Sequence, residues 1–451
     1  MRDLFLAPLL LAIIIQTFRT PSAGVLGWTW LTLMTPQKLI WGMLSSMPLN
    51  LIMALATLPM IAFTRDKRKI PINAVTVLWL LFFFMVTIST ILALSPSMSW
   101  EMWNRCWKLM LLGVLVPVLL TSARNIQALI WVMVISLGYF GVKGGLFTIL
   151  FGSGGHVIGP PGTGLEDNNY LALALCLTLP LMNYLRLQAE SRSVRLVLML
   201  CMISTAFGIM GTFSRGGLIG LGTMAGYLWW KSPRRLPLAI GTVIVLIPAL
   251  YLMPPSWYDR MSTLKDASNQ TTFLTRWDAW KVNWNIAVSR PLTGGGFNAS
   301  QDGGVYRRYS YGQSMYAGPD GETGGHASHS IYFEVLGDHG FIGLGLYLGL
   351  LLATLAMLRR VRKSAKAIPA LAWVTELATM IQVSFLAFFV AGAALSMAYY
   401  DFVFLFIGIT LALDQLIKEY NKGGDAAGDQ LRSSKNAGKN EKWRAPALHA
   451  S

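Results

Sequence analysis

Three of the five histidines lie in one short stretch, HASHSIYFEVLGDHGFIG at residues 326–343. His329 stands between Ser328 and Ser330, a residue type that favours helix N-caps, directly before a long apolar run. The positive end of a helix dipole disfavours an imidazolium, so a neutral imidazole at this position is suited to act as a general base. We therefore take His329 as the candidate base. We expect His326 to be a supporting loop neighbour and His339 to pack within the helix.

The same stretch raises the question of a metal site, because His326 and His329 form an HxxH pair. The surrounding GETGGHASH is rich in glycine and is not clearly helical, and the third ligand would have to be Glu322 or Asp338, at no regular spacing. The pattern therefore favours a site without metal, and we expect no cofactor.

A second candidate is an arginine between two apolar runs, in GIMGTFSRGGLIGLG at residues 208–222. Arg215 keeps its charge at any relevant pH and can hold a phosphate through two hydrogen bonds at once. Ser214 precedes it, and Gly216 and Gly217 allow a ligand or a backbone to come close. The alternative is an interfacial arginine at a hairpin turn whose charged head reaches the membrane surface.

A third candidate lies on a helix expected at residues 271–289, TTFLTRWDAWKVNWNIAVS. Helical spacing puts one set of side chains on a common face (Leu274, Trp277, Trp284 and Val288). Another face carries Arg276, Trp280 and Asn283. Arg276 is either a solvated charge paired with Asp278 or Glu322, or a second phosphate ligand. Two converging arginines would suit a pyrophosphate.

Weaker candidates are polar residues beside or within other apolar runs. Lys143 is a lone cation in GYFGVKGGLF, and Asp167, Asn168 and Asn169 are expected to cap the helix that follows them. We expect Arg105 and Lys108 to face lipid phosphates, and Asp401 to pair with a cation across the bundle.

The elements that must position these residues are membrane helices. The chain is 54% hydrophobic and 13% charged, and its apolar residues form blocks long enough to span a bilayer. The net charge of +16 does not indicate nucleic-acid binding, because the basic residues form short clusters between the apolar blocks. That distribution is the positive-inside pattern of a polytopic membrane protein.

We therefore predict an all-α polytopic membrane protein with about twelve transmembrane helices. Residues 1–253 form the N-terminal membrane helices, 254–329 a large loop with an amphipathic helix, 330–418 the C-terminal membrane helices, and 419–451 a disordered cytoplasmic tail. The loop falls opposite the basic clusters, which in a bacterium is the periplasm. Its aromatic residues predict a helix that lies over the membrane face and roofs a cavity.

These pieces resemble the O-antigen ligase superfamily. The matching segments are SRGG at 214–217, the helix with Arg276, RPLTGGGF at 290–297, and HSIYFEVLGDHGFIGL at 329–344. The last segment is the most specific, and Tyr332 belongs to its pattern. VISLGYFGVKGGLFTIL and EDNNYLALAL look like the subgroup of O-glycosylation ligases.

The resemblance implies a GT-C-like glycosyltransferase in the inner membrane of a Gram-negative bacterium, with its active site facing the periplasm. The donor would be a glycan on undecaprenyl pyrophosphate, the acceptor a hydroxyl of the lipid A core, and the mechanism inverting and metal-independent. By position, His329 would be the base, and Arg215 and Arg276 would hold the pyrophosphate. Ser214, Tyr332, His326 and Lys143 would have supporting roles.

Three other functions stay open at this point. An O-antigen polymerase and a protein O-glycosylation ligase would use the same donor with a different acceptor. A transporter of lipid-linked sugars fits less well, because transporters often carry charges near the membrane midplane, whereas the candidate charges here gather at one interface.

Overall fold

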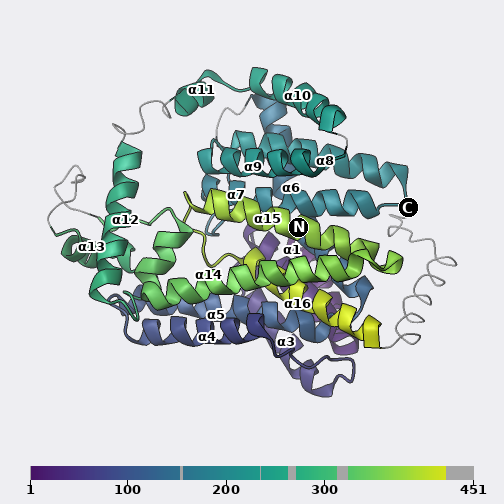
Figure 1. Ribbon diagram of the computed structural model, residues 1–451, viewed down its shortest axis with the longest axis horizontal. Coiled ribbons are helices and arrows are strands. Elements are labelled where there is room, and N and C mark those ends of the chain that lie inside the picture. Colours follow the sequence, from purple (N-terminus) through teal and green to yellow (C-terminus); the bar gives the residue numbers. More distant parts are fainter. Residues whose placement is uncertain (1, 153–155, 234, 263–270, 312–323, 423–451) are drawn as a thin grey trace.

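The computed structural model describes residues 2–152, 156–233, 235–262, 271–311 and 324–422, and within these ranges it contains helices and no strand. The predicted all-α class is confirmed. Most helices run side by side along the longest axis of the molecule, so the chain forms one elongated bundle (Figure 1).

Seven of the described helices are long and apolar enough to cross a membrane. They are α4 (Ala74–Ile91), α5 (Pro96–Leu119), α6 (Ala123–Phe151), α7 (Asn168–Gln188), α8 (Arg192–Gly211), α14 (Ile331–Lys366) and α15 (Ala372–Gly392). The chain is thus a multi-pass membrane protein, with fewer qualifying spans than the twelve or so predicted. The apolar blocks do form helices, but several of these have only 14 to 17 residues, against about 20 for a full span. These shorter helices are α2 (Pro21–Met34), α3 (Leu49–Phe63), α9 (Arg215–Lys231) and α10 (Arg235–Tyr251).

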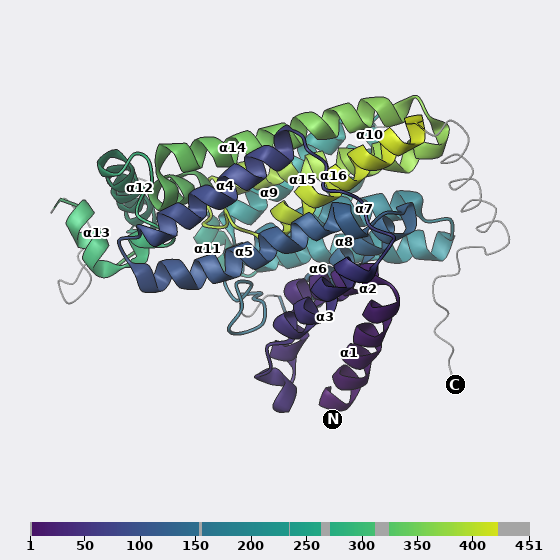
Figure 2. The same cartoon turned by 90° about the horizontal axis from the view of Figure 1, so that it is seen from below.

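The first helices run in a different direction from the main bundle, and α2 packs against α5 and α6. Figure 2 shows α1 (Arg2–Arg19) and α3 projecting steeply from the bundle, with α2 beside them. At the other terminus, α16 (Asp401–Lys422) continues past the predicted boundary at 419, and residues 423–451 of the predicted tail lie outside the described residues.

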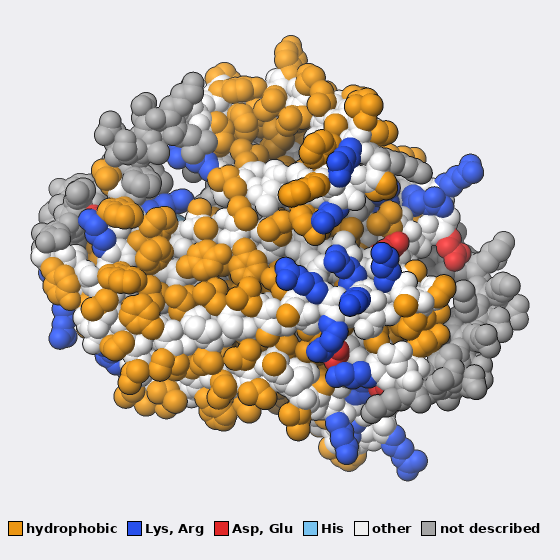
Figure 3. All heavy atoms as spheres, viewed as in Figure 1, with side chains coloured by type: hydrophobic (Ala, Val, Ile, Leu, Met, Phe, Trp, Pro, Cys, Tyr) orange, Lys and Arg blue, Asp and Glu red, His pale blue; other side chains and the backbone are white. Residues whose placement is uncertain are grey.

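The core of the bundle is formed by α7, α14, α15 and α16, which pack against α4, α5 and α9. α6 packs closely on α8, where Gly145 lies against the backbone of Ser204 and leaves no room for a side chain. Large apolar side chains cover much of the outer surface, and Lys and Arg gather near the C-terminal end of α14 (Figure 3). This distribution suits a surface that meets lipid along its middle.

The expected loop contains three helices in its described part: α11 (Pro255–Ser262), α12 (Thr271–Ser289) and α13 (Gly303–Tyr309). α12 lies across one end of the bundle, which we call the loop end, and packs against α14 (Figures 1 and 2). Trp277, Trp284 and Val288 are exposed, whereas Asn283 is buried. The two faces predicted for this helix are therefore observed.

α14 is two helical pieces joined at Gly340, whose backbone angles are φ 69° and ψ −169°. A Cβ at this position would lie 2.6 Å from the carbonyl oxygen of Pro291, which also accepts a hydrogen bond from the Phe341 amide. Only glycine tolerates both the dihedrals and the contact. The break thus joins the GDHG segment to the RPLTGGGF segment and fixes the first piece of α14, residues 331–339, at the loop end.

Candidate active site

His329 lies immediately before α14 in a left-handed backbone conformation, with φ 46°. Its amide donates to Ser396 Oγ over 2.6 Å, and the Ser328 and Ser396 hydroxyls are 3.2 Å apart. From the other side, Trp280 Nε1 donates to the Ser328 carbonyl over 2.8 Å. Positive φ is unfavourable for a histidine, so α12 and the α15–α16 connection (residues 393–400) together hold this residue in place.

Ser330 occupies the N-cap position of α14, but its side chain makes no capping hydrogen bond. The expected serine cap is therefore absent at this helix, and the hydrogen bond from His329 to Ser396 fixes the turn in its place. No feature of the local sequence points to Ser396, because it lies 67 residues away along the chain.

Several charges act on the His329 imidazole. Burial lowers its pKa below the usual value, the Arg276 guanidinium and His326 lower it further, and the Asp167 carboxylate acts in the opposite direction. The ring is therefore neutral at neutral pH, as predicted, although burial is the leading cause. Nδ1 is buried and has no hydrogen-bond partner within the described residues. A buried polar atom left in this state calls for an explanation, and a catalytic role is one.

Arg276 reaches this site from α12. It lies one helical turn before Trp280, whose ring stacks on Phe333 at 5.0 Å between centroids. The stacking and the hydrogen bond to Ser328 fix α12 against the start of α14. Arg276 is thereby placed close enough to His329 for its charge to act on the imidazole.

Arg215 is the first residue of α9, and Ser214 is its N-cap. Ser214 Oγ accepts from the Gly217 amide over 3.1 Å and donates to Asn169 Oδ1 over 2.8 Å. A Cβ on the next residue, Gly216, would lie 3.4 Å from the Leu395 side chain, directly beside Ser396. The start of α9 is therefore packed against the segment that binds the His329 amide.

Asp167 caps α7 by accepting hydrogen bonds from the Asn169 and Tyr170 amides, as predicted, and Asn168 donates to the Thr212 carbonyl. These contacts bring the N-terminus of α7 to that of α9, beside the start of α14. Three helix N-termini thus meet at the loop end, each presenting its positive end to the same region. A region where helix N-termini meet is suited to a multiply charged anion, and Arg215, as the first residue of α9, stands at one of these termini.

The supporting candidates differ in their positions. The His326 amide donates to the Ser300 carbonyl, and its ring packs edge-on against Tyr306. Burial lowers the pKa of His326, while Asp278 raises it. Tyr332 donates its hydroxyl to the Phe389 carbonyl and so joins α14 to α15, and Lys143 is exposed on α6.

Two acidic residues of α14 without a predicted catalytic role are buried beside the site. Glu334 accepts from the Ala398 amide over 2.9 Å, and Asp338 accepts from the Tyr399 hydroxyl over 3.0 Å. Both bonds join the first piece of α14 to the α15–α16 connection. An ionisable residue within a membrane helix is a functional candidate by default, and that rule would have identified them.

His339 is fully buried, with Nδ1 2.5 Å from Ser89 Oγ and its ring edge-on to Phe297. It packs within the helix, as predicted. In the part of the chain that the structure describes, no three His, Cys, Asp or Glu side chains gather where a metal could bind, and Glu322 lies outside those ranges.

Two family models match the chain. Residues 1–190 match a family of unknown function, DUF5935, and residues 196–348 match a family described as O-antigen ligase. The second range contains Arg215, Arg276 and His329. No curated protein matches the sequence significantly.

Proposed function

Because the chain belongs to the O-antigen ligase superfamily, we propose that it transfers a glycan from undecaprenyl pyrophosphate to a hydroxyl of the lipid A core. The reaction takes place on the periplasmic side of a Gram-negative inner membrane, at the loop end of the bundle. The observation that carries the proposal is the state of His329, which has a lowered pKa and a buried Nδ1 without a partner in the described residues.

The donor pyrophosphate binds where α7, α9 and α14 begin. Arg215 stands at the start of α9, and Arg276 acts on His329 from α12. The arginines and the helix N-termini offset the charge that develops on the pyrophosphate as it leaves. The Ser214–Asn169 and Trp280–Ser328 hydrogen bonds fix the helices that carry these arginines, so the helices need little rearrangement during the reaction.

In the transfer step, the His329 imidazole takes the proton of the acceptor hydroxyl. The oxygen attacks the anomeric carbon from the side opposite the pyrophosphate and forms the new glycosidic bond. The bond between that carbon and the phosphate oxygen breaks, and undecaprenyl pyrophosphate leaves with the electron pair. The anomeric configuration is inverted, and the broken phosphate–sugar bond supplies the driving force.

The direct test mixes the purified full-length protein with undecaprenyl-pyrophosphate glycan and lipid A core and measures the glycosylated product. His329→Asn is the informative variant, because asparagine tolerates positive φ and retains the backbone conformation while removing the base. We expect transfer to fall by about 10²–10⁴-fold, the usual contribution of a general base, with donor binding preserved.

Parallel reactions offer a second lipid-linked glycan or a periplasmic protein with Ser and Thr residues as the acceptor. Product formed only with the lipid-linked glycan would make the enzyme a polymerase. Product formed only with the periplasmic protein would make it a protein O-glycosylation ligase. Transfer to none of the three would refute the glycosyltransferase assignment. Full activity in a folded His329→Asn variant would refute the assignment of the base.

A further inference from the structure

The start of α5 lies at the loop end (Figure 2), where the α4–α5 turn (residues 92–95) meets a segment of the loop. We call this segment, residues 290–302, the bridging segment. The Leu94 amide donates to the Gly295 carbonyl over 2.8 Å. A Cβ on Gly296 would lie 2.4 Å from a Cβ atom of the turn, so the two backbones are in close contact.

Ser95 makes a polar contact across this junction. Its hydroxyl donates to Asp302 Oδ2 over 3.0 Å and does not cap α5, although Ser95 is the N-cap residue. The other carboxylate oxygen, Asp302 Oδ1, accepts from the Gly304 and Val305 amides at the start of α13. The hydrogen bonds from Val305 and Ser95 lower the pKa of Asp302, so this loop residue is charged at neutral pH. Ser95 thus binds a charged group that α13 already holds in place, and such a hydrogen bond is stronger than a neutral one.

The other side of the bridging segment binds the residues around the candidate base. Two amides of its glycine run donate to carbonyls in the first piece of α14, each over 2.8 Å. The Ser300 carbonyl accepts a hydrogen bond from the His326 amide over 3.0 Å. Because His326 lies just before His329 in the chain, the bridging segment connects the start of α5 to the backbone that leads into the base.

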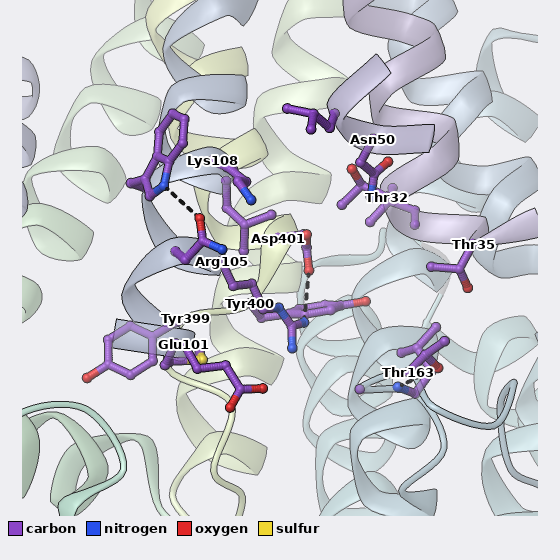
Figure 4. A pocket seen from close by; sticks show the side chains of 18 of the residues that line it. Thr32, Thr35, Asn50, Glu101, Arg105, Lys108, Thr163, Tyr399, Tyr400 and Asp401 are labelled. Carbon is purple, nitrogen blue, oxygen red and sulfur yellow. Dashed lines mark hydrogen bonds and ion pairs between the residues drawn. The ribbon is translucent and has the colours of Figure 1, made fainter. Parts of the chain in front are cut away.

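Further along α5, Arg105 supports the α15–α16 connection. Arg105 Nη2 lies 3.9 Å from Asp401 Oδ2, and Asp401 is the largely buried first residue of α16. This contact confirms that Asp401 pairs with a cation across the bundle. Figure 4 shows the pair beside Tyr400, at the end of the connection, where all three side chains line a pocket. The same connection carries Ser396, whose hydroxyl accepts from the His329 amide.

Both contacts come from one helix of the region that matches a family of unknown function, residues 1–190. Both lead to elements that hold His329, whose left-handed backbone persists only where its surroundings fix it. Displacement of a catalytic group by about 1 Å can lower a rate about 10²-fold. A helix that fixes two supports of the base would therefore influence the reaction without touching a substrate.

We propose that α5 positions the candidate base. Ser95, through Asp302, fixes the bridging segment, and Arg105, through Asp401, fixes the α15–α16 connection. Ser95 and Arg105 are therefore positioning residues, and the region of unknown function acquires a role at the candidate active site. The effect on transfer rests on the proposed function, whereas the effect on the order of the backbone around His329 does not.

Amide hydrogen exchange, measured by mass spectrometry on the full-length protein in nanodiscs, tests the proposal without substrates. In Ser95→Ala, the amides of residues 324–330 should exchange about tenfold faster or more, because the bridging segment loses a hydrogen bond to a charged group. Ser95→Thr retains a hydroxyl, and a φ of −123° before Pro96 suits a β-branched residue, so this variant should keep the wild-type rates. Wild-type rates at residues 324–330 in Ser95→Ala would overturn the proposal.

Ser204→Ala is the matched control. Ser204 is buried like Ser95, and its hydroxyl joins α8 to α6 by donating to the Val142 carbonyl over 3.1 Å, on different elements from those that hold His329. The control should lower the melting temperature about as much as Ser95→Ala does, but it should leave exchange at residues 324–330 unchanged. If both variants raised that exchange equally, Ser95 would support only the fold, and the proposal would fail.

The kinetics of transfer test whether the effect reaches the base. In Ser95→Ala, kcat should fall about tenfold or more, while KM for the donor changes little. The same substitution in the His329→Asn background should cause no further loss, because there is no base left to position. An equal loss in both backgrounds would show that Ser95 does not act through His329, which would overturn the proposal.

Arg105→Gln tests the second contact. It removes the positive charge but leaves a side chain that can donate a hydrogen bond to Asp401, so the buried carboxylate retains a partner. Exchange at residues 324–330 should rise and kcat should fall, each by about tenfold, whereas Arg105→Lys should stay close to the wild type. Wild-type exchange and kcat in Arg105→Gln would overturn the part of the proposal that concerns Arg105.

This proposal and the proposed function fail in distinguishable ways. If the wild type transfers no glycan to any acceptor, the proposed function fails, and hydrogen exchange still decides whether α5 orders the backbone around His329. If the wild type transfers glycan and Ser95→Ala keeps both the exchange rates and kcat, α5 does not position the base and the proposed function stands.

Discussion

The backbone amide of His329 donates a hydrogen bond to the Ser396 hydroxyl over 2.6 Å, and this bond holds a histidine at a φ of 46°. Trp280 holds the preceding residue from the opposite side. The backbone at residues 328 and 329 is thus fixed by contacts from two separate elements, and neither contact uses a nitrogen of the imidazole ring. Such an arrangement is suited to a group that must keep its position while it exchanges a proton.

Replacement of Ser396 by alanine tests this relationship. The buried His329 amide would lose its acceptor, which costs about 1–3 kcal/mol and favours a relaxed backbone. We expect kcat of the proposed transfer to fall about 10-fold or more, with a smaller change in KM for the donor. The measurement is steady-state kinetics of Ser396→Ala beside its melting temperature.

Ser384→Ala is the matched control, because Ser384 is likewise a buried serine with a hydrogen-bonded hydroxyl. Its hydroxyl donates to the Leu177 carbonyl, away from the site. It should lose stability to a similar degree and retain its kcat. Equal losses of activity in the two variants would mean that Ser396 supports only the fold.

The pH dependence of transfer tests the environment of His329. Burial and Arg276 lower the pKa of His329, and the base works only when it is neutral. In a plot of kcat against pH, the apparent pKa on the acid side (the acid limb) should therefore lie below the usual histidine value of about 6.5. Activity should be lost as the pH falls through this apparent pKa. In Arg276→Gln the positive charge is gone, so the pKa rises and the limb should move to higher pH.

Arg276→Lys keeps a positive charge at this position, so its acid limb should stay close to that of the wild type while KM for the donor rises. Saturating donor separates the two effects. If the apparent pKa of the acid limb were the same in wild type, Arg276→Gln and Arg276→Lys, the limb would not reflect the titration of His329 beside Arg276.

The features that follow from local patterns were predictable from the sequence. The two faces of α12 come from helical periodicity, and the cap at Asp167 from residue type. Both of these depend on residues close together in the chain. The neutral state of His329 was also predicted, from its place at a helix start, but in the structure burial and the Arg276 guanidinium lower its pKa, and the local sequence does not show either.

The contacts that complete the site were not predictable in this way. Trp280 and Ser328 are separated by 48 residues, and His329 and Ser396 by 67. The sequence indicated that Asp401 would pair with a cation but not that this cation would be Arg105 of α5, at 3.9 Å. Seven of the described helices are long and apolar enough to span a membrane, so the count of about twelve stays a prediction. An apolar block predicts a helix without giving its length or tilt.

Arg215 allows a test of phosphate binding that is independent of the base. Lysine keeps the charge but cannot form two parallel hydrogen bonds to a phosphate. We expect Arg215→Lys to raise KM for the donor by about tenfold, which corresponds to roughly 1.4 kcal/mol. Because lysine keeps the positive charge at this position, the pH at which activity falls on the acid side should not move. Arg359→Lys, at an exposed site far along α14, is the control. An unchanged donor KM in Arg215→Lys would support the alternative of an interfacial arginine.

The break in α14 at Gly340 can be tested through stability. In Gly340→Ala the new Cβ would lie 2.6 Å from the Pro291 carbonyl and 3.0 Å from the Gly294 amide, in a conformation that alanine rarely adopts. This backbone conformation, which essentially only glycine adopts, alone costs about 1–3 kcal/mol, and the contacts add to it. We expect a lower melting temperature and reduced transfer, because the first piece of α14 carries the contacts that hold His329.

Gly345→Ala is the matched control on the same helix, where an added Cβ would meet no atom within 4 Å. Alanine there should leave stability unchanged or raise it by up to about 1 kcal/mol, because alanine favours helix. If Gly340→Ala were as stable and active as Gly345→Ala, α14 would not need its break at Gly340. The GDHG and RPLTGGGF segments would then have to be joined by two other hydrogen bonds, from the Gly295 and Gly296 amides to the carbonyls of residues 337 and 338.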